Sequence, residues 1–165
     1  MRNKPVVIAV SGVKNSGKTT LITKLIPKLT EAGYKVATIK HDGHDFDVKG
    51  TDSYRHKEAG AYGSAVFSNN KFMIVKDNKD TSEEELMKFF PEAHIILLEG
   101  FKFSDYPKVE IVRKGNSTKS VCKRESLLAL VSDADLDECG IRIIDLNDID
   151  SIAELLINYV EDIRG

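Results

Sequence analysis

The sequence predicts an α/β protein of the P-loop NTPase type, with a mostly parallel sheet flanked by helices. Two apolar runs, at residues 5–10 and 94–99, have the continuous aliphatic character of strands that are buried on both faces. The first run leads directly into a glycine-rich segment and then into apolar residues at helical spacing, and strand and helix patterns alternate along the rest of the chain. A length of 165 residues suits one core, so residues 1–165 are predicted to form a single nucleotide-binding domain.

In the first half of the chain, turn and capping residues separate the predicted elements. Apolar residues at helical spacing between Leu21 and Leu29 define the first helix. Pro27 predicts a kink or an end near Ile26, and Gly33 can terminate the helix. The elements that follow are a strand at 35–40, a polar segment at 41–53, a short helix at 53–59, and strands at 64–68 and 72–75. The two asparagines between the last two strands favour a hairpin.

The second half of the chain continues this alternation. An acidic helix is predicted over residues 81–90, with Leu86, Phe89 and Phe90 on its inner face. Three further strand candidates follow, at 109–112, 127–131 and 141–146. A capping box at residues 151–154 opens the last helix, whose apolar stripe is wide enough to pack on a sheet.

A phosphate-binding pattern, G-x-x-x-x-G-K-[ST], begins where the first strand ends. The glycines let the backbone fold around a polyphosphate with its N–H groups pointing inward, and the following helix adds the positive end of its dipole. In such a loop Lys18 reaches the β- and γ-phosphates, and the hydroxyl of Thr19 can bind Mg²⁺. The predicted nucleotide-binding residues are Gly12, Val13, Lys14, Asn15, Ser16, Gly17, Lys18, Thr19 and Thr20.

Acidic residues just after the strands are candidates for the metal and the chemistry, because ligands of open parallel sheets bind beyond the carboxyl ends of the strands. Glu99 closes a run of four aliphatic residues, the Walker B arrangement, whose carboxylate accepts from a Mg²⁺-bound water or orients the attacking water. Lys18 and Glu99 are therefore the predicted catalytic residues. Thr19, Glu99 and Asp42 are the predicted metal-binding residues, although Asp42 fits the role of a turn former as well.

The base that the site would bind is harder to assign. The guanine-reading tetrad of GTPases, Asn-Lys-x-Asp, does not occur in the sequence. Asp133 follows the predicted strand 127–131 and can accept hydrogen bonds from the guanine N1 and N2 groups, but a loop aspartate that faces water explains it equally well. The residues alone leave the choice between guanine and adenine open.

Composition and charge argue against several classes of protein. The formal net charge of −2 lacks the basic surplus of a general nucleic-acid binder. No apolar stretch reaches the length of a membrane span, and Met1 is followed closely by the first strand, so we expect neither a membrane segment nor a signal peptide. The two cysteines are far apart, which is typical of reduced thiols in a cytoplasmic protein.

Several blocks of residues, in order over most of the chain, resemble the molybdopterin-guanine dinucleotide biosynthesis protein B (MobB) family. The blocks are Gly12–Thr20, Gly33–His41, Phe46 and Asp47 with Asp52 and Ser53, Ala59–Ala61, Leu98–Lys102, Pro107–Glu110 and Ala129–Asp133. The resemblance implies a GTP-binding protein that uses Mg²⁺, has weak GTPase activity and is usually a homodimer. It also implies a partner, the guanylyltransferase that attaches GMP to molybdopterin. One departure is Lys49, which stands where family members typically carry an acid.

Two other functions stay open. A small-molecule kinase of the P-loop class would use Lys40 or Lys102 to hold an acidic acceptor. A metallochaperone-type GTPase would bind metal through His41, His44 and the cysteines, although these histidines fit a surface or phosphate-facing position as well. No arginine is clearly placed to act on the γ-phosphate, and Arg55 and Arg113 are the internal ones to test, so we expect slow turnover without a partner.

Overall fold

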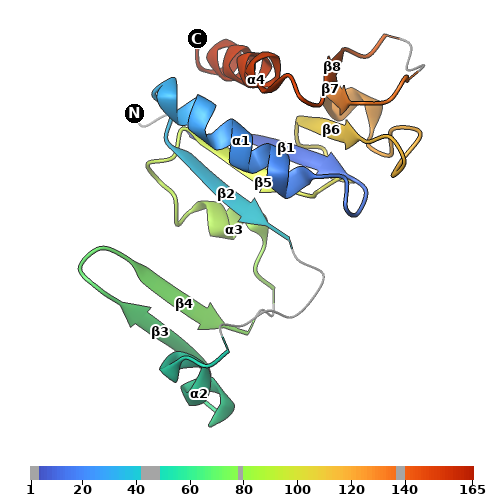
Figure 1. Cartoon of the computed structure of the whole chain (residues 1–165). Helices are drawn as coiled ribbons and strands as arrows, with labels where there is room; N and C mark the ends of the chain where they lie inside the picture. Colours follow the sequence, from blue (N-terminus) through green and yellow to red (C-terminus); the bar gives the residue numbers. More distant parts are fainter. Residues whose placement is uncertain (1–3, 42–48, 78–79, 137–139) are drawn as a thin grey trace. The chain divides into compact units, whose positions relative to one another are not determined.

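The computed structural model describes residues 4–41, 49–77, 80–136 and 140–165 (Figure 1). The chain forms two compact units, one made of Met1–His41 together with Glu83–Gly165 and the other of Asp42–Ser82. The first unit carries the phosphate-binding pattern. That residues 1–165 act as one nucleotide-binding domain stays a prediction.

A six-stranded parallel sheet forms the centre of the first unit. Its strands are β1 (Val6–Gly12), β2 (Val36–Lys40), β5 (Ile95–Glu99), β6 (Lys108–Val112), β7 (Leu127–Ser132) and β8 (Ile143–Asp145). They lie in the order β2-β5-β1-β6-β7-β8, and every neighbouring pair is parallel. The predicted α/β class with a mostly parallel sheet is confirmed, and all six strands end at the same edge of the sheet.

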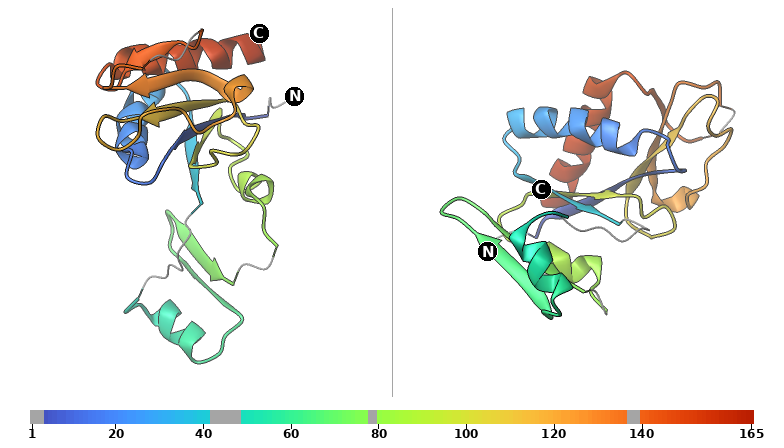
Figure 2. Two further views of the ribbon diagram at one scale, coloured as in Figure 1. Left: turned by 90° about the vertical axis from the view of Figure 1, so that its right-hand side faces the viewer. Right: turned by 60° about the horizontal axis from the view of Figure 1, so that its bottom comes forward.

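Two helices cover one face of this sheet (Figures 1 and 2). α1 (Lys18–Glu31) and α4 (Ile149–Arg164) pack against each other, and both bury apolar residues against β1 and β5 to β8. On the opposite face, a smaller cluster of buried residues includes Ala9, Ile39 and Leu98, and Phe101 and Tyr106 pack against it. A short 3₁₀ helix, η1 (Arg124–Ser126), precedes β7. The main core therefore lies between the helices and the sheet.

The first helix runs through its proline. Of the kink or end predicted near Ile26, the end is wrong, because α1 continues through Pro27 to Glu31. Leu25 and Leu29 are fully buried on either side of Pro27, and burial of this face outweighs the hydrogen bond that proline removes. The chain then leaves the helix at Gly33, which has φ 90°, as predicted.

The last helix begins earlier than predicted. Asp148 is its N-cap: one carboxylate oxygen accepts from the Ser151 N–H at 3.1 Å, and the other accepts from the Ser151 hydroxyl at 2.7 Å. The capping box predicted to open at Ser151 is therefore wrong, because the capping side chain lies three residues earlier. The predicted apolar stripe is confirmed, with Ile152, Leu156 and Val160 fully buried.

The acidic helix is much shorter than predicted. α3 covers only Glu83–Met87, and residues 88–90 continue as turns in which each N–H donates to the carbonyl three residues earlier. These tighter turns end the α-helix, so residues 88–90 do not continue its apolar face. Leu86, Phe89 and Phe90 are 38%, 63% and 38% exposed, so the predicted inner face is wrong.

The second unit holds α2 (Asp52–Glu58) and a two-stranded sheet of β3 (Gly63–Phe67) and β4 (Phe72–Lys76). The strands pair in antiparallel register, with Phe67 opposite Phe72, which confirms the predicted hairpin. Within the hairpin Phe67, Phe72 and Ile74 lie on one face and are exposed. The two-stranded sheet therefore carries an apolar face.

No helix in the described part of the chain is both long enough and apolar enough to cross a bilayer.

Candidate functional site

The predicted phosphate loop is a tight turn between β1 and α1. Gly12 has φ 141°, and a Cβ at this position would lie 2.7 Å from both the Ile111 carbonyl and the Ser16 hydroxyl. Asn15 (φ 61°) and Gly17 (φ 102°) are also left-handed, and α1 begins at the next residue. The loop thus leads into a helix N-terminus, where backbone N–H groups are left for a ligand.

The side chain of Lys18 folds back onto this loop and binds its backbone. Its Nζ donates to the carbonyl of Val13 at 2.8 Å and to that of Gly12 at 3.3 Å. Burial lowers the pKa of Lys18, while the negative charge of Glu99 acts in the opposite direction. The ammonium group therefore lies at the loop, next to a carboxylate, where phosphate oxygens could replace its two carbonyl partners.

Glu99 meets the loop from the neighbouring strand β5. The Thr19 hydroxyl donates to Glu99 Oε1 at 2.7 Å, and the Nζ of Lys40 lies 3.5 Å from the same oxygen. The side chain of Glu99 is only 12% exposed, whereas that of Lys40 is 53% exposed. The structure therefore brings together the two described residues predicted to bind the metal, and adds Lys40 to them.

Lys40 was considered in the sequence only as a contact for a kinase substrate. Its place beside Glu99 follows from the sheet, because β2 pairs with β5 and the two residues occupy the same register position. The signal in the sequence was that Lys40 closes a strand. The neighbour of that strand could not be read from the sequence.

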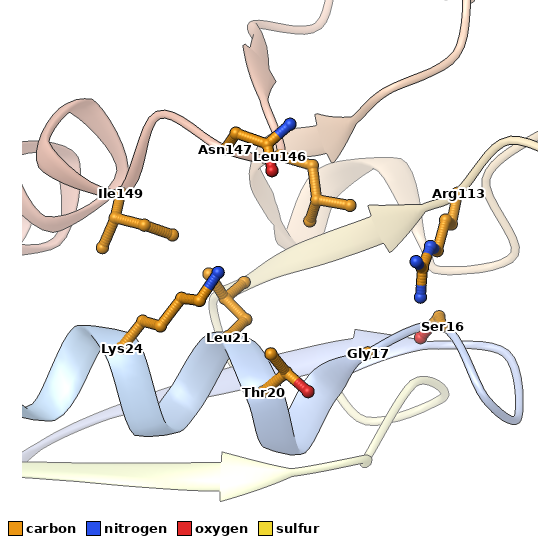
Figure 3. Close-up of a pocket in the computed structure, with 9 residues that line it drawn as sticks. All are labelled: Ser16, Gly17, Thr20, Leu21, Lys24, Arg113, Leu146, Asn147 and Ile149. Atoms are coloured by element: carbon orange, nitrogen blue, oxygen red, sulfur yellow. The ribbon is translucent and has the colours of Figure 1, made fainter.

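A pocket adjoins the phosphate loop along α1 (Figure 3). The residues that line it are Ser16, Gly17, Thr20, Leu21, Lys24, Arg113, Leu146, Asn147 and Ile149. Figure 3 shows the Arg113 guanidinium pointing toward Ser16 and the loop. The sequence analysis did not predict that Leu146, Asn147 and Ile149 would line a pocket beside the loop.

Ser16 contributes an unusual group to the loop. The residue is fully buried, and its hydroxyl finds no hydrogen-bond partner among the described residues. A buried polar atom without a partner is costly and calls for an explanation. A bound anion or the hydroxyl of a ligand would supply the missing bond.

The other predicted residues have different surroundings. Asp133 is exposed, and its Oδ1 accepts from the backbone N–H of Lys114 at 2.7 Å, which ties the end of β7 to the loop after β6. Lys14 is exposed, and its carbonyl accepts from the side-chain amide of Asn116 at 3.2 Å. Asp42 lies outside the described residues, so its role in metal binding stays a prediction.

The residues proposed for a metallochaperone do not come together in the part of the chain that the structure describes. No three His, Cys, Asp or Glu side chains form a metal-binding group there. Cys122 is a free thiol whose pKa is raised to about 12, mainly by burial and also by Glu110. His44 and Cys139 lie outside the described residues.

The donors at the loop suit a polyphosphate that carries a hard cation. Backbone N–H groups and an ammonium group bind phosphate, and a hydroxyl with a carboxylate supplies the oxygen ligands that Mg²⁺ prefers. The close packing around Gly12 and the unpartnered Ser16 hydroxyl both fit a loop shaped for a ligand. GTP and Mg²⁺ thus fit the residues that are present.

Comparisons with known proteins identify the family of this chain. Residues 7–133 match the family described as molybdopterin guanine dinucleotide synthesis protein B, or MobB. The molybdopterin-guanine dinucleotide biosynthesis adapter protein of Haemophilus influenzae is 32% identical, covering 100% of this chain and 95% of its own length, and that of Escherichia coli is 29% identical, covering 96% and 95%. The crystal structure of Bacillus subtilis MobB has a TM-score of 0.75 and 26% identity, covering 92% of this chain and 96% of that one. The family match spans most of the chain, and the chain therefore belongs to the MobB family.

Proposed function

We propose that this protein binds GTP with Mg²⁺ at the phosphate loop and acts as a nucleotide-binding adaptor in molybdenum cofactor biosynthesis. The pathway is supported by the two bacterial relatives, which are named molybdopterin-guanine dinucleotide biosynthesis adapter proteins and match over nearly their whole length. The nucleotide is supported by the residues at the loop.

One observation carries the nucleotide proposal, the contact of Thr19 with Glu99 beside Lys18. Thr19 and Glu99 would hold the magnesium ion, and Lys18 and the backbone N–H groups would hold the phosphates. When bound, Mg²⁺ neutralises phosphate charge and orders water. Because phosphoryl transfer needs mainly positioning and charge neutralisation, Lys18 and Glu99 are the residues proposed for a slow GTP hydrolysis.

The pocket along α1 supports one orientation of the nucleotide relative to the loop. Glu99 and Lys18 mark the end that would take the γ-phosphate, and the pocket with Arg113 and Asn147 continues from the loop along the helix. We assign the nucleoside to this pocket. Asp133, the predicted acceptor for guanine, is not among the residues that line it, so its role stays a prediction.

The apolar hairpin supports a partner. Phe67, Phe72 and Ile74 expose a contiguous apolar face, and such faces are typical of binding surfaces. We propose the guanylyltransferase that attaches GMP to molybdopterin as the partner, and a homodimer as the form of the protein.

The test is a nucleotide-binding assay with matched charge variants. A fluorescent GTP analogue is titrated with Lys18→Ala and with Lys28→Ala, which removes the same charge from an exposed pair with Asp150. We expect Lys18→Ala to weaken binding by about tenfold to a hundredfold, since it loses charge-assisted hydrogen bonds, and Lys28→Ala to bind like the parent.

Competition by unlabelled GTP and ATP, with and without a molybdopterin guanylyltransferase, tests the preference for guanine and the proposed partner. GTP should displace the probe better than ATP, and the protein should co-sediment with the transferase. A correctly folded Lys18→Ala protein that binds as tightly as the parent would overturn the nucleotide site, and equal displacement by ATP would overturn the choice of guanine.

A further inference from the structure

Lys108, the first residue of β6, is fully buried, and its ammonium group donates hydrogen bonds to one short turn, residues 101–104. Its Nζ donates to the carbonyl of Ser104 at 2.6 Å, to the hydroxyl of Ser104 at 3.2 Å and to the carbonyl of Phe101 at 3.1 Å. Burial lowers the pKa of Lys108, because the charged form loses its water. An apolar side chain would fill the same space at lower cost, so these three bonds to residues 101–104 are what lysine contributes here.

The turn that Lys108 holds has an unusual backbone. Gly100 and Phe101 are successively left-handed, at φ 104° and 52°, and this conformation is uncommon for a residue such as phenylalanine. The Phe101 carbonyl is the centre of the turn, since it also accepts from the hydroxyl and the N–H of Ser104, at 2.7 and 3.1 Å. On the other side, the Ser11 hydroxyl donates to the Gly100 carbonyl. The turn is thus held by side chains from two strands, Ser11 of β1 and Lys108 of β6.

In the sequence, Lys102 lies between Phe101 and Ser104, the two residues whose carbonyls accept from Lys108. The turn begins directly after Glu99, at the edge of the sheet where the phosphate loop lies. Ser11, whose hydroxyl donates to the Gly100 carbonyl, directly precedes Gly12 at the start of the phosphate loop, so the turn that carries Lys102 lies against the loop. Its Nζ lies 4.9 Å from the centroid of the Phe103 ring, and a cation–π contact at an exposed ring is weak enough to be exchanged for a phosphate oxygen.

We propose that Lys102 is a further ligand of the terminal phosphate and that Lys108 is its positioning residue, which clamps the 101–104 turn so that the Lys102 ammonium faces the phosphate loop. The inference rests on the proposed GTP site and adds two residues to it. In a turn without the clamp, Lys102 would keep its charge but lose its fixed place, so the γ-phosphate would gain less from it.

The experiment is a double-mutant cycle on the ratio of GTP to GDP affinity. The full-length parent, Lys102→Met, Lys108→Met and the double variant are titrated with both nucleotides in the presence of Mg²⁺. Each single variant should lower the preference for GTP over GDP by about tenfold, the value of one charge-assisted hydrogen bond. The double variant should lose no more than either single variant, because both act through one group. Leu156→Ala, in the α4 core, controls for lost stability and should reduce both affinities equally.

Ser104→Ala provides a second route if Lys108→Met does not fold, since it removes a hydroxyl that contacts both Lys108 and Phe101. It should reduce the GTP preference in the same direction by a smaller factor. A parent that binds GTP no better than GDP would overturn this inference and leave the nucleotide site intact. Unchanged preference in Ser104→Ala and Lys102→Met, or additive losses in the double variant, would do the same, whereas a parent that binds no GTP would overturn both proposals.

Discussion

Replacing Gly12 by alanine tests how tightly the phosphate loop is packed, and Gly33 provides a matched control. Both glycines have φ in the left-handed range, at 141° and 90°. A Cβ at Gly12 would lie 2.7 Å from the Ile111 carbonyl and from the Ser16 hydroxyl, whereas a Cβ at Gly33 would meet nothing within 4 Å. Both substitutions therefore carry a backbone penalty, and only Gly12→Ala adds a steric one.

The magnitudes follow from this difference. Forcing alanine into a left-handed conformation costs about 1 kcal/mol, and this is the whole loss expected for Gly33→Ala. Overpacking against a backbone carbonyl adds about 2 kcal/mol, so Gly12→Ala should lose about 3 kcal/mol of unfolding free energy. The difference between the variants corresponds to about a 30-fold change in the equilibrium constant of unfolding.

Urea denaturation followed by far-UV circular dichroism measures both losses. The m-values of the variants should equal that of the parent, so that the midpoints report stability. Gly12→Ala should also lose nucleotide binding, since the Ser16 side chain must move, while Gly33→Ala should bind normally. Equal losses of stability in the two variants would show that the loop can relax, and the reasoning from close packing would be wrong.

Two further predictions concern Ser16 and Asp148. Ser16→Ala should change the unfolding free energy by less than about 0.5 kcal/mol, because no hydrogen bond within the described residues is lost, yet it should weaken nucleotide binding; a stable variant with parental affinity would contradict this. The pKa of Asp148 is lowered by bonds from the hydroxyl and the N–H of Ser151. Its charged form therefore stabilises the fold above the ordinary carboxyl value of 3.8, and this contribution is lost as the pH falls through the lower folded pKa. The stability difference between the parent and Asp148→Asn should vanish in strong acid, as urea midpoints at several pH values can show.

Local patterns were enough to predict most of the fold. The buried strands show themselves by continuous apolar residues, and the phosphate loop by spacing, since both signals lie within a few residues. The choice of helix cap is different, because Asp148 and Ser151 are both good capping residues. The residue that caps the helix depends on where the chain leaves β8, and the position of β8 is set by the assembled sheet.

The site shows the same division. Lys18, Thr19 and Glu99 were predictable, because each belongs to a short pattern with a known chemistry. Lys40 and Arg113 were not placed in advance, because each merely ends or follows a strand. Their positions depend on strand order: β2 lies beside β5, and β6 lies beside β1. Strand order is set by tertiary packing, which no local pattern in the sequence records.

The charges around the loop give a physical reason for an anionic ligand. The positive charges of Lys40 and Lys102 both act on Lys18, beside the carboxylate of Glu99. The Lys18 pKa is lowered first by burial and also by the two other lysines, while the charge of Glu99 raises it. A triphosphate with its magnesium ion would supply the missing negative charge without disturbing the fold. In the proposed complex, relief of this repulsion among the lysines would contribute to the free energy of binding.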